Sequence, residues 1–150
     1  MKSSIASIQS LLWDLFPIYN HIGLTVESVS NGLYRCRIPI NDQNLNHIRT
    51  IHACIQWAAA EVLGGLVVIA NLDHSRLFFV VRTVTIRFLK PARTHVSAEA
   101  VFADKRVKEL QDKLILRGEA GFDLDAVIRD NHGTIVAETS AEYLIRKKRE

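Results

Sequence analysis

Three polar side chains lie in or next to the longest apolar run of the chain, residues 50–71. Asn46 precedes this run, His52 stands near its start, and Glu61 falls close to its midpoint. If the run is a helix, its first turn presents unpaired N–H groups and the positive end of the helix dipole. Such a terminus suits a carbonyl oxygen that becomes anionic during acyl transfer, with the N–H of Ala53 as the donor. The residue types and their order therefore indicate acyl-transfer chemistry.

The carboxyl group of Glu61 is the second part of this candidate site. Apolar surroundings would raise the pKa of Glu61, which suits a base that works near neutral pH; a structural glutamate capped by a neighbouring side chain is the alternative. Glu61 follows His52 by nine residues, or roughly 13 Å along a helix. One chain cannot bring both groups to the same reacting atom, so a second copy would have to supply one of them.

The apolar run itself predicts a helix of about twenty residues, with Thr50 as its N-cap and Asn71 as its C-cap. A helix that is apolar on nearly all sides is either buried in a protein core or spans a membrane. Glu61 at the midpoint would cost about 2.5–3.5 kcal/mol in a membrane, and Gly64-Gly65 suits a close crossing against other backbone. These two features favour a buried helix and no membrane span.

The rest of the chain is mainly β-prone. A short amphipathic helix is expected over residues 3–16, ended by Pro17. The Asn31-Gly32 pair indicates a hairpin turn. Residues 104–116 fit either a charged helix or a broken strand. Strands are expected at residues 24–30, 33–40, 77–89, 96–103, 122–130 and 134–145.

This order of elements predicts an α+β fold in one domain, residues 1–150, with an N-terminal helical segment at 1–17 and a basic tail at 146–150. Strands joined by hairpin turns form antiparallel sheets, and one such sheet has one face to bury. The long helix is the element apolar enough to fill that face. A curved antiparallel sheet of five to six strands, wrapped around one long central helix, satisfies both requirements.

Composition narrows the function classes. The net charge is +3 from 19 basic and 16 acidic residues, and four of the basic residues fall in the last six positions, so a nucleic-acid partner is not expected. Cys36 and Cys54 make no disulfide framework, and with no signal peptide evident we expect a cytoplasmic protein. Asp123 and Asp125 have no third ligand at suitable spacing, so no metal is expected.

Two motifs resemble the hotdog-fold acyl-CoA thioesterases. The first runs from Asn46 through His52-Ala53 to Glu61, followed by Gly64-Gly65. The second, Val-Thr-Ile-Arg-Phe-Leu-Lys-Pro-Ala at residues 84–92, is similar to the strand that ends in a Lys/Arg-Pro-Ala turn in that family. The branch that looks most similar is the PaaI-like and Arthrobacter-type 4-hydroxybenzoyl-CoA thioesterase group. The resemblance covers roughly residues 20–145.

The resemblance implies the hotdog fold and a role for each matched residue. Glu61 would be the general base or nucleophile that hydrolyses the thioester, and the N–H of Ala53 would polarise its carbonyl. His52 would orient that carbonyl, and Asn46 would position the water or the carboxylate. These groups would meet across the interface of a homodimer, with a dimer of dimers as a further arrangement.

The substrate implied is an acyl-CoA, so coenzyme A enters as part of the substrate and no other cofactor is expected. Lys90 and Arg93, after the strand that ends at residue 89, are candidates to bind the CoA phosphates. Arg49 stands where the family usually has glycine, and there it would clamp an acidic substrate or obstruct the entrance. Ala53-Cys54 replaces the usual Gly-Gly. These departures motivate the alternative of a non-catalytic acyl-CoA-binding hotdog protein. A hotdog dehydratase or hydratase would need a motif that is absent here.

Overall fold

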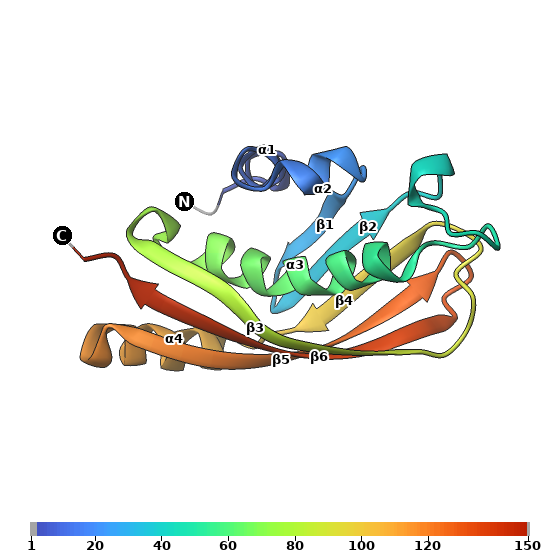
Figure 1. The fold of residues 1–150 in the computed structure, drawn as a ribbon. Coiled ribbons are helices and arrows are strands. Elements are labelled where there is room, and N and C mark those ends of the chain that lie inside the picture. Colours follow the sequence, from blue (N-terminus) through green and yellow to red (C-terminus); the bar gives the residue numbers. More distant parts are fainter. Residues whose placement is uncertain (1–2, 150) are drawn as a thin grey trace.

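A computed structural model describes residues 3–149 and shows one six-stranded antiparallel sheet in the order β1-β2-β4-β5-β6-β3 (Figure 1). The helices are α1 (Ile5–Leu15), α2 (Pro17–His21), α3 (Ala53–Asn71) and α4 (Asp104–Arg117), with short 3-10 turns η1 (Asp42–Asn44) and η2 (His74–Arg76). The strands are β1 (Thr25–Ser30), β2 (Leu33–Ile38), β3 (Leu77–Phe88), β4 (Val96–Val101), β5 (Glu119–Asp130) and β6 (Ile135–Lys147).

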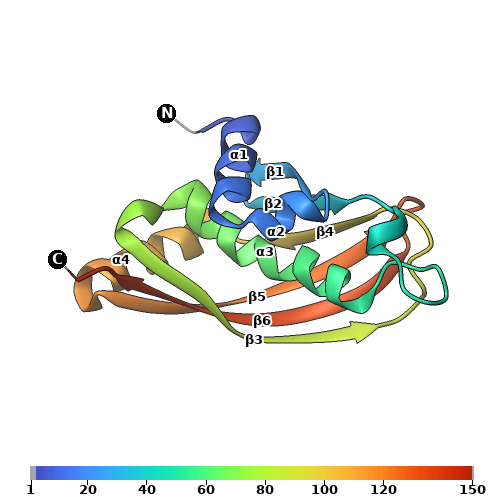
Figure 2. The ribbon, with the colours of Figure 1, turned by 45° about the horizontal axis from the view of Figure 1, so that its top comes forward.

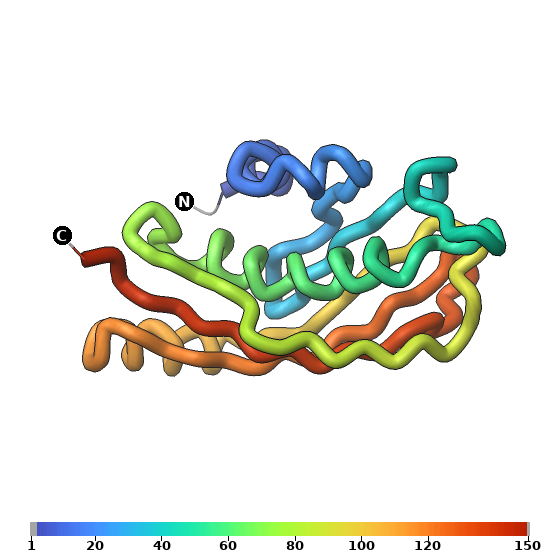
Figure 3. The backbone as a smooth tube through the Cα atoms, viewed as in Figure 1, coloured from blue at the N-terminus to red at the C-terminus, as the bar shows by residue number. Residues whose placement is uncertain are grey.

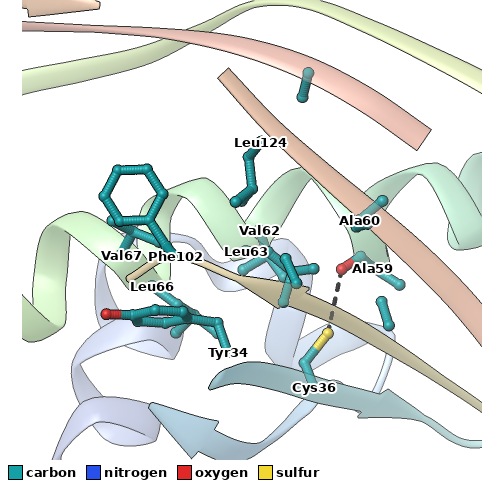
Figure 4. Packing of buried hydrophobic residues seen from close by; sticks show 14 of the residues in the cluster. Tyr34, Cys36, Ala59, Ala60, Val62, Leu63, Leu66, Val67, Phe102 and Leu124 are labelled. Carbon is teal, nitrogen blue, oxygen red and sulfur yellow. Dashed lines mark hydrogen bonds between the residues drawn. The ribbon is translucent and has the colours of Figure 1, made fainter. Parts of the chain in front are cut away.

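The sheet curves around α3, which lies along its inner face (Figures 1 and 2). Side chains of α3 such as Leu63 and Leu66 are fully buried, and Figure 4 shows them between Tyr34 of β2, Phe102 and Leu124 of β5. Among residues 3–149, α3 is the one helix long and apolar enough to cross a membrane, and most of its apolar stretch is buried inside the domain. The predicted core helix and hotdog architecture are confirmed.

The predicted β1–β2 hairpin is present. Ser30 pairs with Leu33, which leaves Asn31 and Gly32 as a two-residue turn. Their φ angles are 55° and 74°, and this turn type requires positive φ at both positions, which Asn and Gly tolerate best. The local sequence thus determined the turn.

Helix α3 begins later than predicted. Its N-cap is His52, whose side chain accepts a hydrogen bond from the N–H of Cys54, and not Thr50. Thr50 instead closes the preceding loop by pairing with Asn46. At the other end the C-cap is Leu72, and Asn71 belongs to the last turn. Thr50 is engaged by local hydrogen bonds within the loop, and Asn71 donates to the hydroxyl of Tyr34 on β2, so neither residue serves as a cap.

Residues 104–116 form helix α4 rather than a broken strand. Val107, Leu110 and Leu114 recur at helical spacing and are buried, and α4 packs against β5. Gly118 at φ 73° ends the helix in the left-handed conformation. The last strand also runs further than expected, so Arg146 and Lys147 of the predicted basic tail belong to β6.

The N-terminal helices lie on the side of α3 opposite β5 and β6 (Figures 1 and 2). Ser4 caps α1 by accepting from the N–H of Ser7 at 3.1 Å. The indole N–H of Trp13 donates to the carbonyl of Leu24 at 2.9 Å, which fastens α1 beside the start of β1. Pro17 does more than end α1, because it also starts α2. Helix α2 thereby comes to lie over the middle of α3.

Candidate active site

The loop before α3 is organised around Asn46. Its side-chain Oδ1 accepts from the N–H groups of Ile48 at 3.1 Å and Thr50 at 3.0 Å. Its Nδ2 donates to the hydroxyl of Thr50 at 2.8 Å. The second N–H bond of this amide has no acceptor among residues 3–149. Asn46 therefore holds the loop in shape and retains one donor for another group.

Arg49 forms the tip of this loop with a φ of 61°. That conformation is left-handed and favours glycine, which accounts for the glycine expected at this position from the resemblance. The guanidinium is exposed and lies 3.5 Å from the carboxylate of Asp42. Such an exposed pair contributes little to stability. The Arg49 side chain thus projects from the loop and is available to a ligand.

His52 and Ala53 form the start of α3. The N–H of His52 donates to the carbonyl of Asn44 at 2.8 Å, and its Nδ1 accepts from the N–H of Cys54 at 3.1 Å. Because Nδ1 accepts, a neutral imidazole carries its proton on Nε2 and presents a donor there. The N–H of Ala53 has no acceptor within residues 3–149. The helix start therefore offers two donors, as an oxyanion site requires.

Lys90 and Arg93 lie in the connection between β3 and β4. The N–H of Ile51 donates to the carbonyl of Ala92 at 2.9 Å, so this connection runs beside the start of α3. Figure 3 shows the two loops next to each other at one end of the molecule. Both cationic side chains are exposed. The structure thus gathers Asn46, Arg49, His52, Lys90 and Arg93 at one end of the molecule.

Glu61 is not part of this group within one chain. It lies nine residues further along α3, about 13 Å by the helical rise. Its Oε2 accepts a hydrogen bond from the hydroxyl of Tyr19 on α2. Burial raises the pKa of Glu61, and the bond from Tyr19 lowers it in part. The result is a largely buried carboxyl group held beneath α2.

Two tyrosines were not predicted from the sequence. Tyr19 binds the Glu61 carboxylate, and the hydroxyl of Tyr143 on β6 donates to the backbone carbonyl of Glu61 at 2.8 Å. Alternation of apolar and polar residues along β6 indicates that Tyr143 faces inward, so its burial could have been predicted from the sequence. Tyr19 is 42 residues from Glu61 in a five-residue helix, and no local pattern points from one to the other.

The Gly64-Gly65 pair allows a close contact, although not with backbone as predicted. A Cβ atom at Gly64 would lie 2.2 Å from the ring of Tyr143. At Gly65 the nearest atom would be 3.7 Å away, on Phe79. Only the first glycine is therefore required by packing, and the partner is an aromatic side chain.

The described residues contain no group of three or more His, Cys, Asp or Glu side chains that could hold a metal ion. Asp123 lies 3.2 Å from the guanidinium of Arg106, and Asp125 accepts a hydrogen bond from Ser140. Both aspartates lie on the exposed outer face of the sheet.

Within residues 3–149, one antiparallel sheet around a single long helix defines a protein of the hotdog fold. Its candidate site has donors at the helix start and a half-buried carboxyl group at the middle of the helix. The chain belongs to the family described as a domain of unknown function (DUF4442), whose model matches residues 6–145. No curated protein matches it by sequence.

Solved structures show the same fold. A Pseudomonas aeruginosa protein of unknown function, described as a probable thioesterase, is 28% identical over 99% of both chains, with a TM-score of 0.87. A Chlorobaculum tepidum protein of unknown function is 18% identical over 95% of this chain and 94% of its own, with a TM-score of 0.85. A Staphylococcus aureus thioesterase is 14% identical over 87% of this chain and 98% of its own, with a TM-score of 0.72.

Proposed function

We propose that this protein is a thioester hydrolase whose substrate is an acyl-CoA. The observation that carries the proposal is the half-buried carboxyl group of Glu61 on the same helix whose start presents the N–H of Ala53, which has no acceptor within residues 3–149. A base with a raised pKa and a preorganised oxyanion donor are the two parts that thioester hydrolysis needs. The probable-thioesterase description of the Pseudomonas aeruginosa protein supports the same class.

In the proposed reaction, a water molecule gives a proton to Glu61 while its oxygen bonds to the thioester carbonyl carbon. The developing oxyanion accepts hydrogen bonds from the Ala53 N–H and from Nε2 of His52. The carbon–sulfur bond then breaks, the carboxylic acid is released, and the thiolate takes the proton from Glu61. Direct attack by Glu61 is the other route, and it would pass through an anhydride that water cleaves. Single turnover in ¹⁸O-water identifies the direct route if label appears in Glu61, because only cleavage of the anhydride at the Glu61 carbonyl carbon places it there.

The site as proposed needs two copies of the chain. Strand β3 lies at an edge of the sheet and pairs with β6 on one side only. It is twelve residues long and carries the exposed apolar side chains of Phe78 and Val80. An exposed, long and apolar edge is a template for pairing with another strand. We propose that two β3 strands pair in a homodimer, which brings Glu61 of one copy to the helix start of the other; a dimer of dimers is compatible with this arrangement.

The spacing of Asn46 and Glu61 finds a parallel in the Staphylococcus aureus thioesterase. That enzyme has been solved as two variants, in which a glutamine and a glutamate are replaced by alanine. Those positions lie fifteen residues apart, as do Asn46 and Glu61. The parallel supports a joint role for an amide and a carboxylate at this distance along the chain.

The cationic residues at the same end suit the phosphates of coenzyme A. Arg49, Lys90 and Arg93 are exposed in the loops beside the start of α3, and the pantetheine arm would extend from the thioester at the helix start toward them. We propose that the acyl group resembles those of the PaaI-like and 4-hydroxybenzoyl-CoA thioesterases, and this proposal rests on the two sequence motifs alone.

Cys36 and Cys54 are both free thiols. Free thiols suit a protein of the reducing cytoplasm, which is the location we propose.

The first test is a thiol-release assay on short-chain, long-chain and aromatic acyl-CoAs, with wild type beside Glu61→Ala. We expect turnover in the wild type and a loss of at least a hundredfold in kcat for the variant, in the range of a missing general base. Asp125→Ala, on the outer face of the sheet, is the matched carboxylate control and should retain full activity. Equal rates in wild type and Glu61→Ala would refute the proposed mechanism.

A non-catalytic acyl-CoA-binding protein is the second candidate. Arg49 and Ala53 stand where the resemblance expects glycine, and this departure from the family pattern motivates it. Calorimetric binding of an intact acyl-CoA at micromolar affinity, with no thiol released over hours, would establish this reading. Turnover that disappears in Glu61→Ala would exclude it.

A further inference from the structure

We propose that Tyr19 is a positioning residue for the Glu61 carboxylate: by binding Oε2, it leaves Oε1 as the oxygen that takes the proton from water. The inference rests on the proposed hydrolase function and adds a residue from outside the helix and its loop. It also assigns the two carboxylate oxygens to different tasks.

The two oxygens of Glu61 have different surroundings. Oε2 accepts the hydrogen bond from the hydroxyl of Tyr19. Oε1 accepts no hydrogen bond from residues 3–149. It is also not one of the fully buried polar atoms of this part of the chain that lack a hydrogen-bond partner. Oε1 is therefore open to solvent. A carboxylate held by one oxygen and open at the other is oriented for reaction.

Tyr19 is itself held rigidly. Its N–H donates to the carbonyl of Phe16 at 3.0 Å, and its carbonyl accepts from the N–H of Leu24 at 2.9 Å. Tyr19 is 7% exposed, and its ring packs edge-on against Phe16, with ring centroids 5.7 Å apart. Phe16 in turn packs against Phe79 of β3 at 6.1 Å. The backbone bonds and the contact with Phe16 thus hold Tyr19 in place, and its hydroxyl is directed at Glu61.

Among the charged and titratable groups around Glu61 in residues 3–149, Tyr19 is the one that binds its carboxylate. Tyr19 on α2, Tyr143 on β6 and Cys36 on β2 are the titratable groups that face it or its tyrosine partner. Burial raises the pKa of both tyrosines, and it raises the pKa of the Cys36 thiol to about 12. All three are neutral at physiological pH. Within residues 3–149 no Lys, Arg or His forms an ion pair with Glu61.

It follows that the Tyr19 hydroxyl is the group that favours the ionised carboxylate against burial. Hydrogen bonding to the charged form lowers a carboxyl pKa, so removal of this hydroxyl should raise the pKa of Glu61. Less carboxylate would then exist at a given acidic pH. The freed side chain would also sample rotamers in which Oε1 points away from the substrate.

The test compares Tyr19→Phe with Tyr143→Phe. Both variants keep the ring and remove a hydroxyl bonded to Glu61, but Tyr143 bonds to the backbone carbonyl and leaves the carboxylate untouched. Titration of the ¹³C-labelled Glu61 carboxyl by NMR, assigned with Glu61→Gln, should show the midpoint in Tyr19→Phe raised by about one pH unit, the size of a charge-assisted hydrogen bond. The midpoint in Tyr143→Phe should match the wild type.

Activity supplies a second measurement. In Tyr19→Phe we expect kcat to fall about tenfold with KM little changed, and the acid limb of the kcat profile to move to higher pH. Because NMR needs no turnover, a raised midpoint without any thioesterase activity would uphold the hydrogen bond from Tyr19 to the Glu61 carboxylate and overturn the proposed function on which its catalytic use rests. Equal midpoints in an active enzyme would overturn the positioning role alone.

A measurement on the wild type covers the case in which Tyr19→Phe does not fold. A hydroxyl proton of Tyr19 that is bonded to the carboxylate should appear far downfield in the proton spectrum, and it should move upfield in Glu61→Gln, whose neutral amide oxygen is a weaker acceptor. A Tyr19 hydroxyl that exchanges freely with water in the wild type would contradict the proposal.

Discussion

At the scale of the residue, Glu61 supplies the base for the proposed reaction and lowers the stability of the fold. The carboxyl group lies in a largely apolar helix, and burial raises its pKa with partial relief from Tyr19. Between the unfolded and the folded pKa, the native state binds more protons than the unfolded state. Stability therefore falls as the pH rises through that interval. A residue kept at such a position in a core helix is typical of an active site.

Because the ionised form of Glu61 lowers stability at high pH, Glu61→Gln should stabilise the fold there. The amide keeps the shape and can accept from Tyr19, but it carries no charge to desolvate. We expect the variant to melt at a higher temperature than the wild type at pH 8. The difference should vanish below about pH 4, where the carboxyl group is protonated in both states. Calorimetric melting at several pH values checks this, and a variant that is less stable than wild type at pH 8 would contradict it.

At the scale of the element, the contact between α3 and β6 depends on Gly64. Tyr143 fills the space where a side chain at Gly64 would lie. Its ring also stacks on Phe122 at 5.0 Å between centroids, so it has no room to retreat. The same tyrosine bonds to the carbonyl of Glu61. The contacts of Tyr143 therefore fix the position of α3 relative to β6 next to Glu61.

Two glycine variants test this contact. Gly64→Ala should destabilise the fold by about 1–3 kcal/mol, because a methyl group overpacks a filled site. Gly65→Ala, one residue away on the same helix, is the matched control. It meets only ordinary contact and should stabilise by about 0.5–1 kcal/mol through helix propensity. Urea unfolding of both variants gives the comparison, and similar stabilities for the two would show that Tyr143 can move aside.

At the scale of the whole molecule, the site is divided between the middle and the start of one helix. The donors and cationic side chains lie at the end formed by the loops that precede α3 and β4 (Figure 3). The carboxylate lies under α2 near the centre. The free edge of β3 provides the surface by which a second copy would complete the arrangement.

Val80→Lys tests that surface. A lysine on an edge strand opposes strand pairing, so we expect the dimer to dissociate at least tenfold more readily and turnover to fall in proportion. Val101→Lys is the matched control, because Val101 is also exposed and lies on β4 away from that edge. Sedimentation across a concentration series reports the assembly state. An active wild-type monomer would exclude the shared site.

The sequence by itself determined the elements whose signals are local. The apolar run around Glu61 indicated the core helix, the Asn31-Gly32 pair indicated the hairpin, and the order of strands indicated a sheet with one face to bury. Periodicity and turn chemistry act over a few residues, so they are readable without tertiary contacts. The spacing from Asn46 to His52 and Glu61 likewise followed from the chain alone.

The tertiary structure decided the rest, because it depends on groups far apart in the chain. The N-cap of α3 is His52 and not the predicted Thr50, in a loop that the N–H of Ile51 fastens to the distant carbonyl of Ala92. Residues 104–116 fit a helix or a broken strand by sequence. They form a helix whose apolar side chains pack on β5. Tyr19 reached Glu61 across 42 residues because α1 and α2 fold back over α3. Local patterns specify elements, whereas the partner of a buried carboxylate is specified only when those elements meet.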